Sequence, residues 1–247
     1  MTNQILVALD VDTADAAYAL ADELRGHVGG FKIGSRLFTS HGPSIVESLV
    51  KRGDRVFLDL KFHDIPNTVA GAVAAATRLG VWMVNVHASG GHTMMKAARD
   101  AAETESSKLG QPRPLVIAVT MLTSLSEETM GEIGVADALS AQVGRLAVLA
   151  QSAGLDGVVA SPKEIALIRN RCGDAFEIVT PGIRSAADSV GGEGASRVKD
   201  DQRRTMTAAG ALAAGASYLV VGRPIIAAAD PRAAAERLEA ESRAVAR

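Results

Sequence analysis

The chain alternates eight times between a short run of apolar, β-branched residues and a longer amphipathic, often Ala-rich stretch. The short runs are 5–10, 30–34, 55–60, 83–88, 115–121, 157–161, 177–180 and 218–222. The stretches with helical character lie near 13–26, 43–52, 66–79, 91–104, 137–152, 162–171, 203–214 and 231–245. This alternation is typical of repeated strand–helix units, in which helices cover a parallel sheet.

Eight such units in 247 residues predict an α/β protein with one (β/α)8 TIM barrel, spanning residues 1–247 as a single domain. The short runs are apolar on both faces, as strands covered by helices must be. With 47% hydrophobic residues, the chain has enough apolar side chains for one large core. An open, doubly wound sheet is the alternative architecture.

The charge balance argues against nucleic acid and membrane partners. The 26 Lys and Arg residues against 28 Asp and Glu residues give a formal charge of -2, so no broad basic surface is expected. Cys172 is the only cysteine, which excludes an intrachain disulfide and suits a reducing cytoplasm. The start at Met1 shows no export signal, and no segment has membrane-spanning length. We therefore expect a cytoplasmic protein.

Polar residues follow the apolar runs with a regularity that predicts an active site. Such groups are costly to bury without a partner, and in a barrel the carboxyl ends of all strands meet at one mouth, where barrel enzymes carry their active sites. These residues are Asp10, Lys32, Asp59, Lys61, Asn85, His87, Thr120, Thr123, Ser124, Ser161, Thr180 to Arg184, Gly222 and Arg223.

The block from Asp59 to Thr68 is the densest of these groups. On a regular strand, Asp59 and Lys61 point to the same face, roughly 7 Å apart. Pro66 and Asn67 are expected to open the next helix, with Pro in the first turn and Asn as the cap. The block predicts a catalytic cluster at a strand end, and a purely structural ion-pair network is the alternative.

Two glycine-containing turns near the end of the chain predict a phosphate site. Residues 180–184 (Thr-Pro-Gly-Ile-Arg) follow the seventh run, and residues 222–224 (Gly-Arg-Pro) follow the eighth. Barrels often bind phosphate after these strands through backbone amides. Taken alone, a Gly-Arg-Pro turn is more often an ordinary helix start.

Together these motifs resemble the orotidine 5'-phosphate decarboxylase family, which makes UMP in pyrimidine biosynthesis. The resemblance spans nearly the whole chain. It is carried by residues 8–10, 31–34, 59–68, 86–88, 122–124, 180–184, 201–204 and 222–224. It implies a barrel homodimer with shared active sites at the subunit interface and a requirement for neither metal nor organic cofactor.

The resemblance also implies roles for individual residues. Lys61 would protonate C6 of the pyrimidine as carbon dioxide leaves, with Asp59 beside the departing carboxylate. Lys32 would bridge Asp59 and the ribose. Asp64 and Thr68 would reach into the neighbouring subunit's site, where Asp64 flanks Lys61.

The remaining substrate contacts are implied in the same way. They are Asp10 at the ribose, Thr123 and Ser124 at the base, and Pro181, Arg184, Gln202, Gly222 and Arg223 around the phosphate. A loop near 185–201 would close over the phosphate. For His63 and His87 the sequence leaves the role open, although a hydrogen-bonded structural role is favoured for His87.

Two other functions stay as alternatives. A Mg-dependent sugar-phosphate decarboxylase or aldolase of the same superfamily would carry a carboxylate where this chain has Lys32, and it would lack the base contacts of Thr123 and Ser124. A non-catalytic nucleotide-phosphate-binding barrel would have lost a charged residue of the central block. Here all of them are present.

Overall fold

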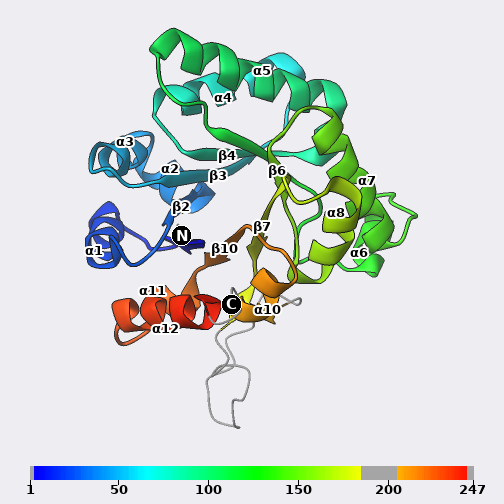
Figure 1. Cartoon of the computed structure of the whole chain (residues 1–247). Helices are drawn as coiled ribbons and strands as arrows, with labels where there is room; N and C mark the ends of the chain where they lie inside the picture. The colour runs from blue at the N-terminus through cyan, green and yellow to red at the C-terminus, as the bar shows by residue number, and fades with distance from the viewer. Residues whose placement is uncertain (1–2, 185–204, 244–247) are drawn as a thin grey trace.

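Eight parallel strands close into a barrel in the computed structural model, which describes residues 3–184 and 205–243. Around the barrel the strands follow the order β1-β10-β7-β6-β5-β4-β3-β2 (Figure 1). Their bounds are β1 Ile5–Ala8, β2 Gly30–Gly34, β3 Val56–Phe62, β4 Met83–His87, β5 Leu115–Val119, β6 Gly157–Val159, β7 Glu177–Pro181 and β10 Tyr218–Val221. The predicted TIM barrel is confirmed, and the open sheet is wrong.

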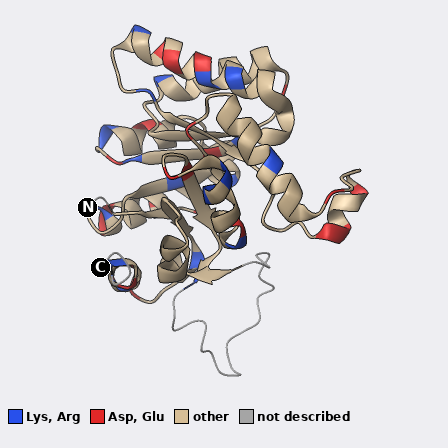
Figure 2. Ribbon diagram, turned by 45° about the vertical axis from the view of Figure 1, so that its right-hand side comes forward, with Lys and Arg blue, Asp and Glu red and all other residues tan. Residues whose placement is uncertain are grey.

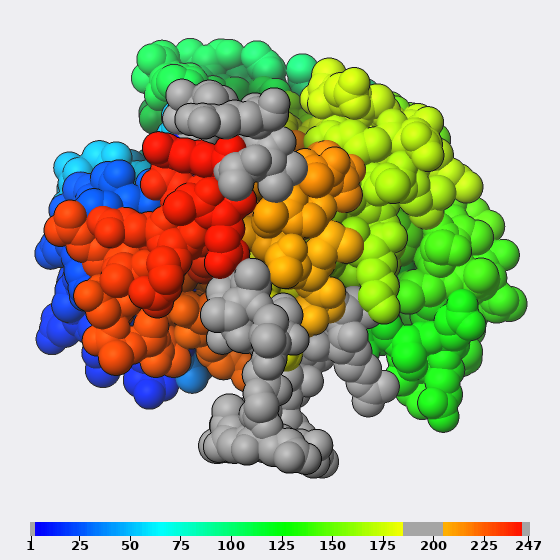
Figure 3. Space-filling model, turned by 60° about the horizontal axis from the view of Figure 1, so that its bottom comes forward, coloured from blue at the N-terminus to red at the C-terminus, as the bar shows by residue number. Residues whose placement is uncertain are grey.

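Helices connect the strands and surround the barrel (Figure 1). Those that correspond to predicted helical stretches are α1 Ala14–Leu24, α3 Ser44–Lys51, α4 Pro66–Arg78, α5 Gly91–Leu109, α7 Leu139–Ser152, α8 Ile165–Cys172, α10 Ala208–Ala213 and α12 Pro231–Arg243. Helix α5 continues to Leu109, beyond the predicted end at residue 104. The ring closes where α12 contacts both α10 and α1 (Figure 3).

Several short elements escaped the sequence prediction because they are too short to show a period. They are the helices α2 Ser35–His41, α6 Glu127–Glu132 and α11 Arg223–Ile226, the 3-10 turns η1 Ala88–Gly90 and η2 Pro162–Glu164, and the small sheet of β8 Ile183–Arg184 and β9 Met206–Thr207. Most predicted strands ran one or two residues too far, since their last residues lie in the loops at the barrel mouth. Strand β3 instead continues to Phe62.

Apolar side chains form two layers, one inside the barrel and one between strands and helices. Leu6, Phe57 and Met83 belong to the inner layer. Their neighbours Val7, Leu58 and Val84 pack in the outer layer with helix residues. Because side chains alternate along a strand, Lys32, Asp59 and Asn85 point inward from β2, β3 and β4. The interior is thus apolar below and polar at the carboxyl ends of the strands.

The start of α4 differs from the sequence prediction. Ile65 is the cap residue, with extended backbone, and Pro66 is the first helical residue. Asn67 therefore lies inside the first turn, and the prediction that it caps the helix is wrong. In its place, the carboxylate of Asp64 accepts a hydrogen bond from the backbone N–H of Ile65 at 2.6 Å.

Charged residues recur along α5 (Figure 2), and none of those in this helix is buried. Within the described ranges, none of the helices has the length and apolarity needed to cross a lipid bilayer.

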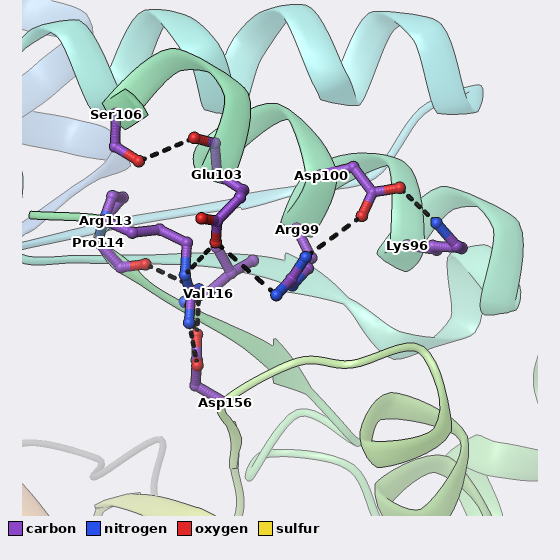
Figure 4. Close-up of polar contacts among 9 residues, drawn as sticks. All are labelled: Lys96, Arg99, Asp100, Glu103, Ser106, Arg113, Pro114, Val116 and Asp156. Atoms are coloured by element: carbon purple, nitrogen blue, oxygen red, sulfur yellow. Dashed lines mark hydrogen bonds and ion pairs between the residues drawn. The ribbon is translucent and has the colours of Figure 1, made fainter. Parts of the chain in front are cut away.

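An ion-pair network ties α5 to the amino-terminal ends of β5 and β6 (Figure 4). Asp156 binds the Arg113 guanidinium through two hydrogen bonds of 2.6 and 2.8 Å, and it also accepts the backbone N–H of Val116 at 2.7 Å. Glu103 pairs with both Arg113 and Arg99. The Asp156 hydrogen bonds raise the pKa of Arg113 above its ordinary value. The partly buried carboxylate of Asp156 thus joins two neighbouring strands.

We predict that Asp156→Ala lowers the free energy of unfolding by about 2 kcal/mol, because hydrogen bonds to charged groups contribute roughly 1.5–3 kcal/mol. Lys96→Ala, which removes an exposed ion pair with Asp100 on the same helix, is the matched control and should cost at most about 0.5 kcal/mol. Urea unfolding measures both. Equal effects of the two substitutions would show that the Asp156 contacts add nothing beyond a surface ion pair.

Candidate active site

The carboxylate of Asp59 is the centre of the polar cluster at the barrel mouth. It is 9% exposed and receives three donors. Lys61 Nζ lies 2.7 Å from Oδ1, Asn85 Nδ2 donates to the same oxygen at 2.7 Å, and Lys32 Nζ lies 3.4 Å from Oδ2. Three neighbouring strands, β2, β3 and β4, therefore place their polar side chains on one group.

The surroundings of Asp59 keep it ionised. Burial disfavours the charged form, but the charges of Lys32 and Lys61, with hydrogen bonds from Lys61 and Asn85, outweigh burial and hold the pKa of this carboxyl below its ordinary range. At neutral pH the mouth therefore holds a buried negative charge between two ammonium groups.

Asp10 extends this arrangement by one more charge. Its carboxylate Oδ1 lies 3.4 Å from Lys32 Nζ, and its side chain is 57% exposed. Gly34 leaves room for the contact, since a Cβ there would stand 3.1 Å from Lys32 Nζ. Asp10, Lys32, Asp59 and Lys61 thus form a row of alternating sign, which we call the charge row.

Lys61 joins the charge row through an irregular strand. Its φ is +52°, which makes it the one non-glycine residue with positive φ in the described part of the chain. From Leu58 to Phe62 along β3, the partner on β4 advances only from Val84 to Val86, so β3 bulges between these pairs. Asp59 and Lys61 are in contact, as the sequence predicted. The regular strand on which that prediction rested is wrong, because β3 bulges here.

Asp64 and Thr68 lie apart from the charge row. Both are exposed, Asp64 on the connection from β3 into α4 and Thr68 in the first turn of α4. Among the described residues, Lys61 forms its ion pair with Asp59, while the Asp64 carboxylate accepts from the Ile65 N–H. Across residues 3–184 and 205–243, Asp59 is therefore the one acidic side chain in contact with Lys61, and Asp64 of the same chain does not flank it.

The other predicted substrate contacts lie on connections that follow strands. Thr123 and Ser124 are between β5 and α6, Pro181 ends β7, Arg184 ends β8, Gly222 precedes α11 and Arg223 is its first residue. Gly222 borders the charge row, because a Cβ there would stand 3.8 Å from Asp10 Oδ2. Gln202 and the loop 185–201 lie outside the described residues.

His63 and His87 form a pair beside Lys61. Their ring centroids are 5.5 Å apart, with a tilt of 31°. Burial lowers the pKa of His87, and electrostatic interactions with His63 and Lys61 lower it further, against a smaller opposing effect of Asp59. His87 is therefore a neutral imidazole at neutral pH.

The sequence predicted that Asn85 lies at the barrel mouth but assigned it no role. Its side chain is fully buried and contacts both Asp59 and Lys61. The available signal was an amide in the middle of an otherwise apolar run. Its partners could not be predicted, since they depend on how β3 and β4 pair.

The charge row leaves little place for a metal ion. Lys32 Nζ lies 3.4 Å from oxygens of both Asp10 and Asp59, the position in which a bound cation would bridge the two carboxylates. Across residues 3–184 and 205–243, no group of three or more His, Cys, Asp or Glu side chains is placed to hold a metal. A cavity of about 340 Å³, lined by Leu115, Phe176 and Glu177 among others, lies at the amino-terminal ends of β5 and β7, away from these charges.

Comparison with known proteins identifies the family to which this chain belongs. Residues 3–238 match the model of the "Orotidine 5'-phosphate decarboxylase / HUMPS family". The orotidine 5'-phosphate decarboxylase of Moorella thermoacetica is 53% identical over 240 residues, which cover 97% of this chain and 92% of the relative. That of Alkalilimnicola ehrlichii is 52% identical over 241 residues, covering 97% and 96%.

Solved structures agree with the fold. The crystal structure of orotidine 5'-phosphate decarboxylase from Lactobacillus acidophilus superposes with a TM-score of 0.83 at 36% identity, covering 97% of this chain and 99% of that one. An uncharacterized conserved protein from Geobacillus kaustophilus gives a TM-score of 0.82 at 37% identity, covering 96% and 99%.

We predict that His87 makes the fold less stable in mild acid. Because its folded pKa lies below the ordinary value of 6.5, protonation favours the unfolded chain, so the stability present above pH 6.5 is lost as the pH falls through the lowered pKa. The melting temperature of the wild type should therefore drop more steeply from pH 7.5 to 5.5 than that of His87→Gln.

Thermal unfolding at a series of pH values measures this difference. His92→Gln, which removes an exposed histidine on α5, is the control and should keep the wild-type slope. Parallel curves for the wild type and His87→Gln would contradict the assignment.

Proposed function

Since this chain belongs to the orotidine 5'-phosphate decarboxylase / HUMPS family and is a carboxy-lyase of pyrimidine biosynthesis, we propose that it converts orotidine 5'-phosphate to UMP and carbon dioxide without a metal ion. The reaction runs through a C6 carbanion that Lys61 protonates. The observation that supports this most directly is the charge row, in which the ionised Asp59 holds the Lys61 ammonium at 2.7 Å.

Loss of carbon dioxide from C6 presents a specific electrostatic problem. The remaining electron pair lies in the plane of the pyrimidine ring, orthogonal to its π system, so resonance does not stabilise it. A positive charge fixed nearby does, and a group already in position needs no reorganisation as the negative charge develops. The Lys61 ammonium supplies this charge and then gives its proton to C6.

Asp59 has two roles in this proposal. It fixes the Lys61 ammonium, and it lies beside the carboxylate that departs. Repulsion between the two carboxylates would raise the energy of the bound substrate, but such ground-state effects are secondary to stabilisation of the carbanion. The buried, ionised state of Asp59 supports both roles.

The remaining contacts bind the nucleotide. Lys32 and Asp10 hold the ribose, next to the reacting charges. The base is addressed by Thr123 and Ser124, and the phosphate by Pro181, Arg184, Gln202, Gly222 and Arg223. We assign closure over the phosphate to the loop 185–201. Binding energy from the phosphate is then used to order the reacting centre.

We further propose that two subunits form each active site. Among the described residues of its own chain, Lys61 has one acidic neighbour in contact with it, whereas Asp64 is exposed on the connection after β3 and Thr68 is exposed in the first turn of α4. Beside them, Ile65 is 68% exposed, which suits a contact with a second copy of the chain. In the homodimer, Asp64 of the partner flanks Lys61 and Thr68 of the partner touches the ribose.

The two alternative functions fit the charge row less well. A Mg-dependent sugar-phosphate enzyme needs carboxylates facing a cation, and here the Lys32 ammonium lies between Asp10 and Asp59. A nucleotide-binding barrel without activity does not need a buried lysine–carboxylate pair, such as Lys32 and Asp59, next to its ligand.

We predict that Lys61→Ala lowers kcat at least about a thousandfold, because acid catalysis and electrostatic stabilisation each contribute roughly 10²–10⁴. Binding of UMP should change little. The loss of orotidine 5'-phosphate absorbance measures turnover, and the wild type should keep its rate after treatment with a chelator.

Lys51→Ala, which alters an exposed lysine on α3, is the matched control and should keep wild-type activity. A decrease of only a few-fold for Lys61→Ala would refute the proton-donor role. Loss of wild-type activity on chelation would favour the Mg-dependent alternative.

Shared active sites predict complementation between two inactive variants. In a mixed dimer of one Asp64→Ala chain and one Lys61→Ala chain, one site has both native residues and the other site has both substitutions. The dimer should therefore recover up to about half of the activity of a wild-type dimer. Two affinity tags allow the heterodimers to be purified and assayed. Absence of recovery in verified heterodimers would show that Asp64 does not act across the interface.

A further inference from the structure

Asn85 is a fully buried amide on β4, opposite the bulge of β3. The two strands pair at Leu58 with Val84 and again at Phe62 with Val86. Asn85 lies between these pairs and faces inward, in the same direction as Met83 of the inner apolar layer. Its side chain therefore lies where the regular contact between β3 and β4 is interrupted.

The Asn85 amide uses both of its ends on β3. Its oxygen Oδ1 accepts the backbone N–H of Lys61 at 2.8 Å, and its nitrogen Nδ2 donates to Asp59 Oδ1 at 2.7 Å. The partners fix the orientation of the amide, because a backbone N–H can only donate and a carboxylate can only accept. One side chain thus connects the two charged residues of the proposed chemistry.

The contact with the Lys61 N–H compensates for the bulge. A residue with φ of +52° cannot continue a regular strand, and Lys61 lies in the irregular stretch between the pairs Leu58–Val84 and Phe62–Val86. Its N–H is satisfied by the side-chain oxygen of Asn85 and not by a backbone carbonyl. This hydrogen bond holds Lys61 in the left-handed conformation from which its ammonium reaches Asp59.

The contact with Asp59 acts on the same ion pair from the other side. Asn85 Nδ2 and Lys61 Nζ donate to the same oxygen, Oδ1, each at 2.7 Å. The amide donor favours the ionised carboxylate and adds no charge of its own. Aspartate would repel Asp59, and leucine would leave the Lys61 N–H unsatisfied and remove one of the two donors to Asp59 Oδ1, so a neutral group that donates and accepts fits this position best.

We propose that Asn85 is a positioning residue for the decarboxylation, holding the Lys61 backbone and the Asp59 carboxylate in the geometry that directs the ammonium to the reacting carbon. This inference rests on the proposed function. Asn85 acts through its two partners and is not proposed to touch the substrate.

The variant N85D separates the two contacts. The new carboxylate can still accept the Lys61 N–H, but it can donate to Asp59 only when protonated. The ionisable groups around it are Asp59 and Lys61 on β3, Lys32 on β2, His87 at the end of β4 and His63 after β3; β5, on the other side of β4, has none over Leu115–Val119. We expect kcat at pH 8 to fall at least about tenfold and to recover in part towards pH 5.5, whereas wild-type kcat should not rise with acidification.

N85A removes both contacts and tests them through the split between kcat and KM. We expect kcat to fall at least about a hundredfold, with KM and UMP affinity within about threefold of wild type, because the phosphate contacts are on other strands. Thr77→Val is the matched control. It alters a fully buried polar residue of α4, whose hydroxyl binds Val73 O at 2.9 Å, and it should lower the melting temperature without changing kcat.

The outcomes distinguish this inference from the function on which it rests. A wild type that leaves orotidine 5'-phosphate unchanged would refute the proposed function. An active wild type with an unchanged pH profile in N85D would refute the positioning role. If N85A does not fold, N85S replaces it, since a hydroxyl can keep one of the two contacts and should give intermediate kcat; wild-type kcat in N85S would also refute the role.

Discussion

A carboxylate that is ionised inside a protein needs compensating charge and hydrogen bonds, and Asp59 imposes this requirement on the whole barrel mouth. Lys32, Lys61 and Asn85 meet it from three strands that are adjacent in the closed sheet. The parallel pairing of β2 with β3 and of β3 with β4 brings them together, because in sequence they span more than one strand–helix unit. The charge row therefore depends on the fold, because the paired strands place this polar layer directly above the apolar interior of the barrel.

Much of this arrangement could be predicted from the sequence. The eight alternating segments indicate the barrel because strand and helix periods are local properties of the chain. The polar residues after the strands indicate the mouth for the same reason. The bulge at Lys61 could not be predicted, since it depends on the register between β3 and β4, and the role of Asn85 depends on that bulge. The cap at Ile65 was missed because Asn67 is a good cap by type and stands one position beyond Pro66.

The two ends of the barrel use charge differently. At the amino-terminal end, Arg113 and Asp156 join neighbouring strands, and the Arg55 guanidinium lies 5.3 Å from the Trp82 ring. Trp82 packs edge-on against Tyr218, with centroids 5.1 Å apart. At the carboxyl end, Asp10 and Lys61 remain partly exposed, so they can meet a substrate. Stability and chemistry thus occupy opposite ends, as is general in this architecture.

Two requirements conflict at Lys61: the left-handed backbone favours glycine, and the proposed chemistry needs a side-chain amine. Glycine adopts this conformation without steric strain, while lysine adopts it at an energetic cost. Stability alone would favour glycine at this position, whereas the proposed reaction needs the amine. Lysine in this backbone is then a compromise, in which some stability is given up to place an ammonium group beside Asp59.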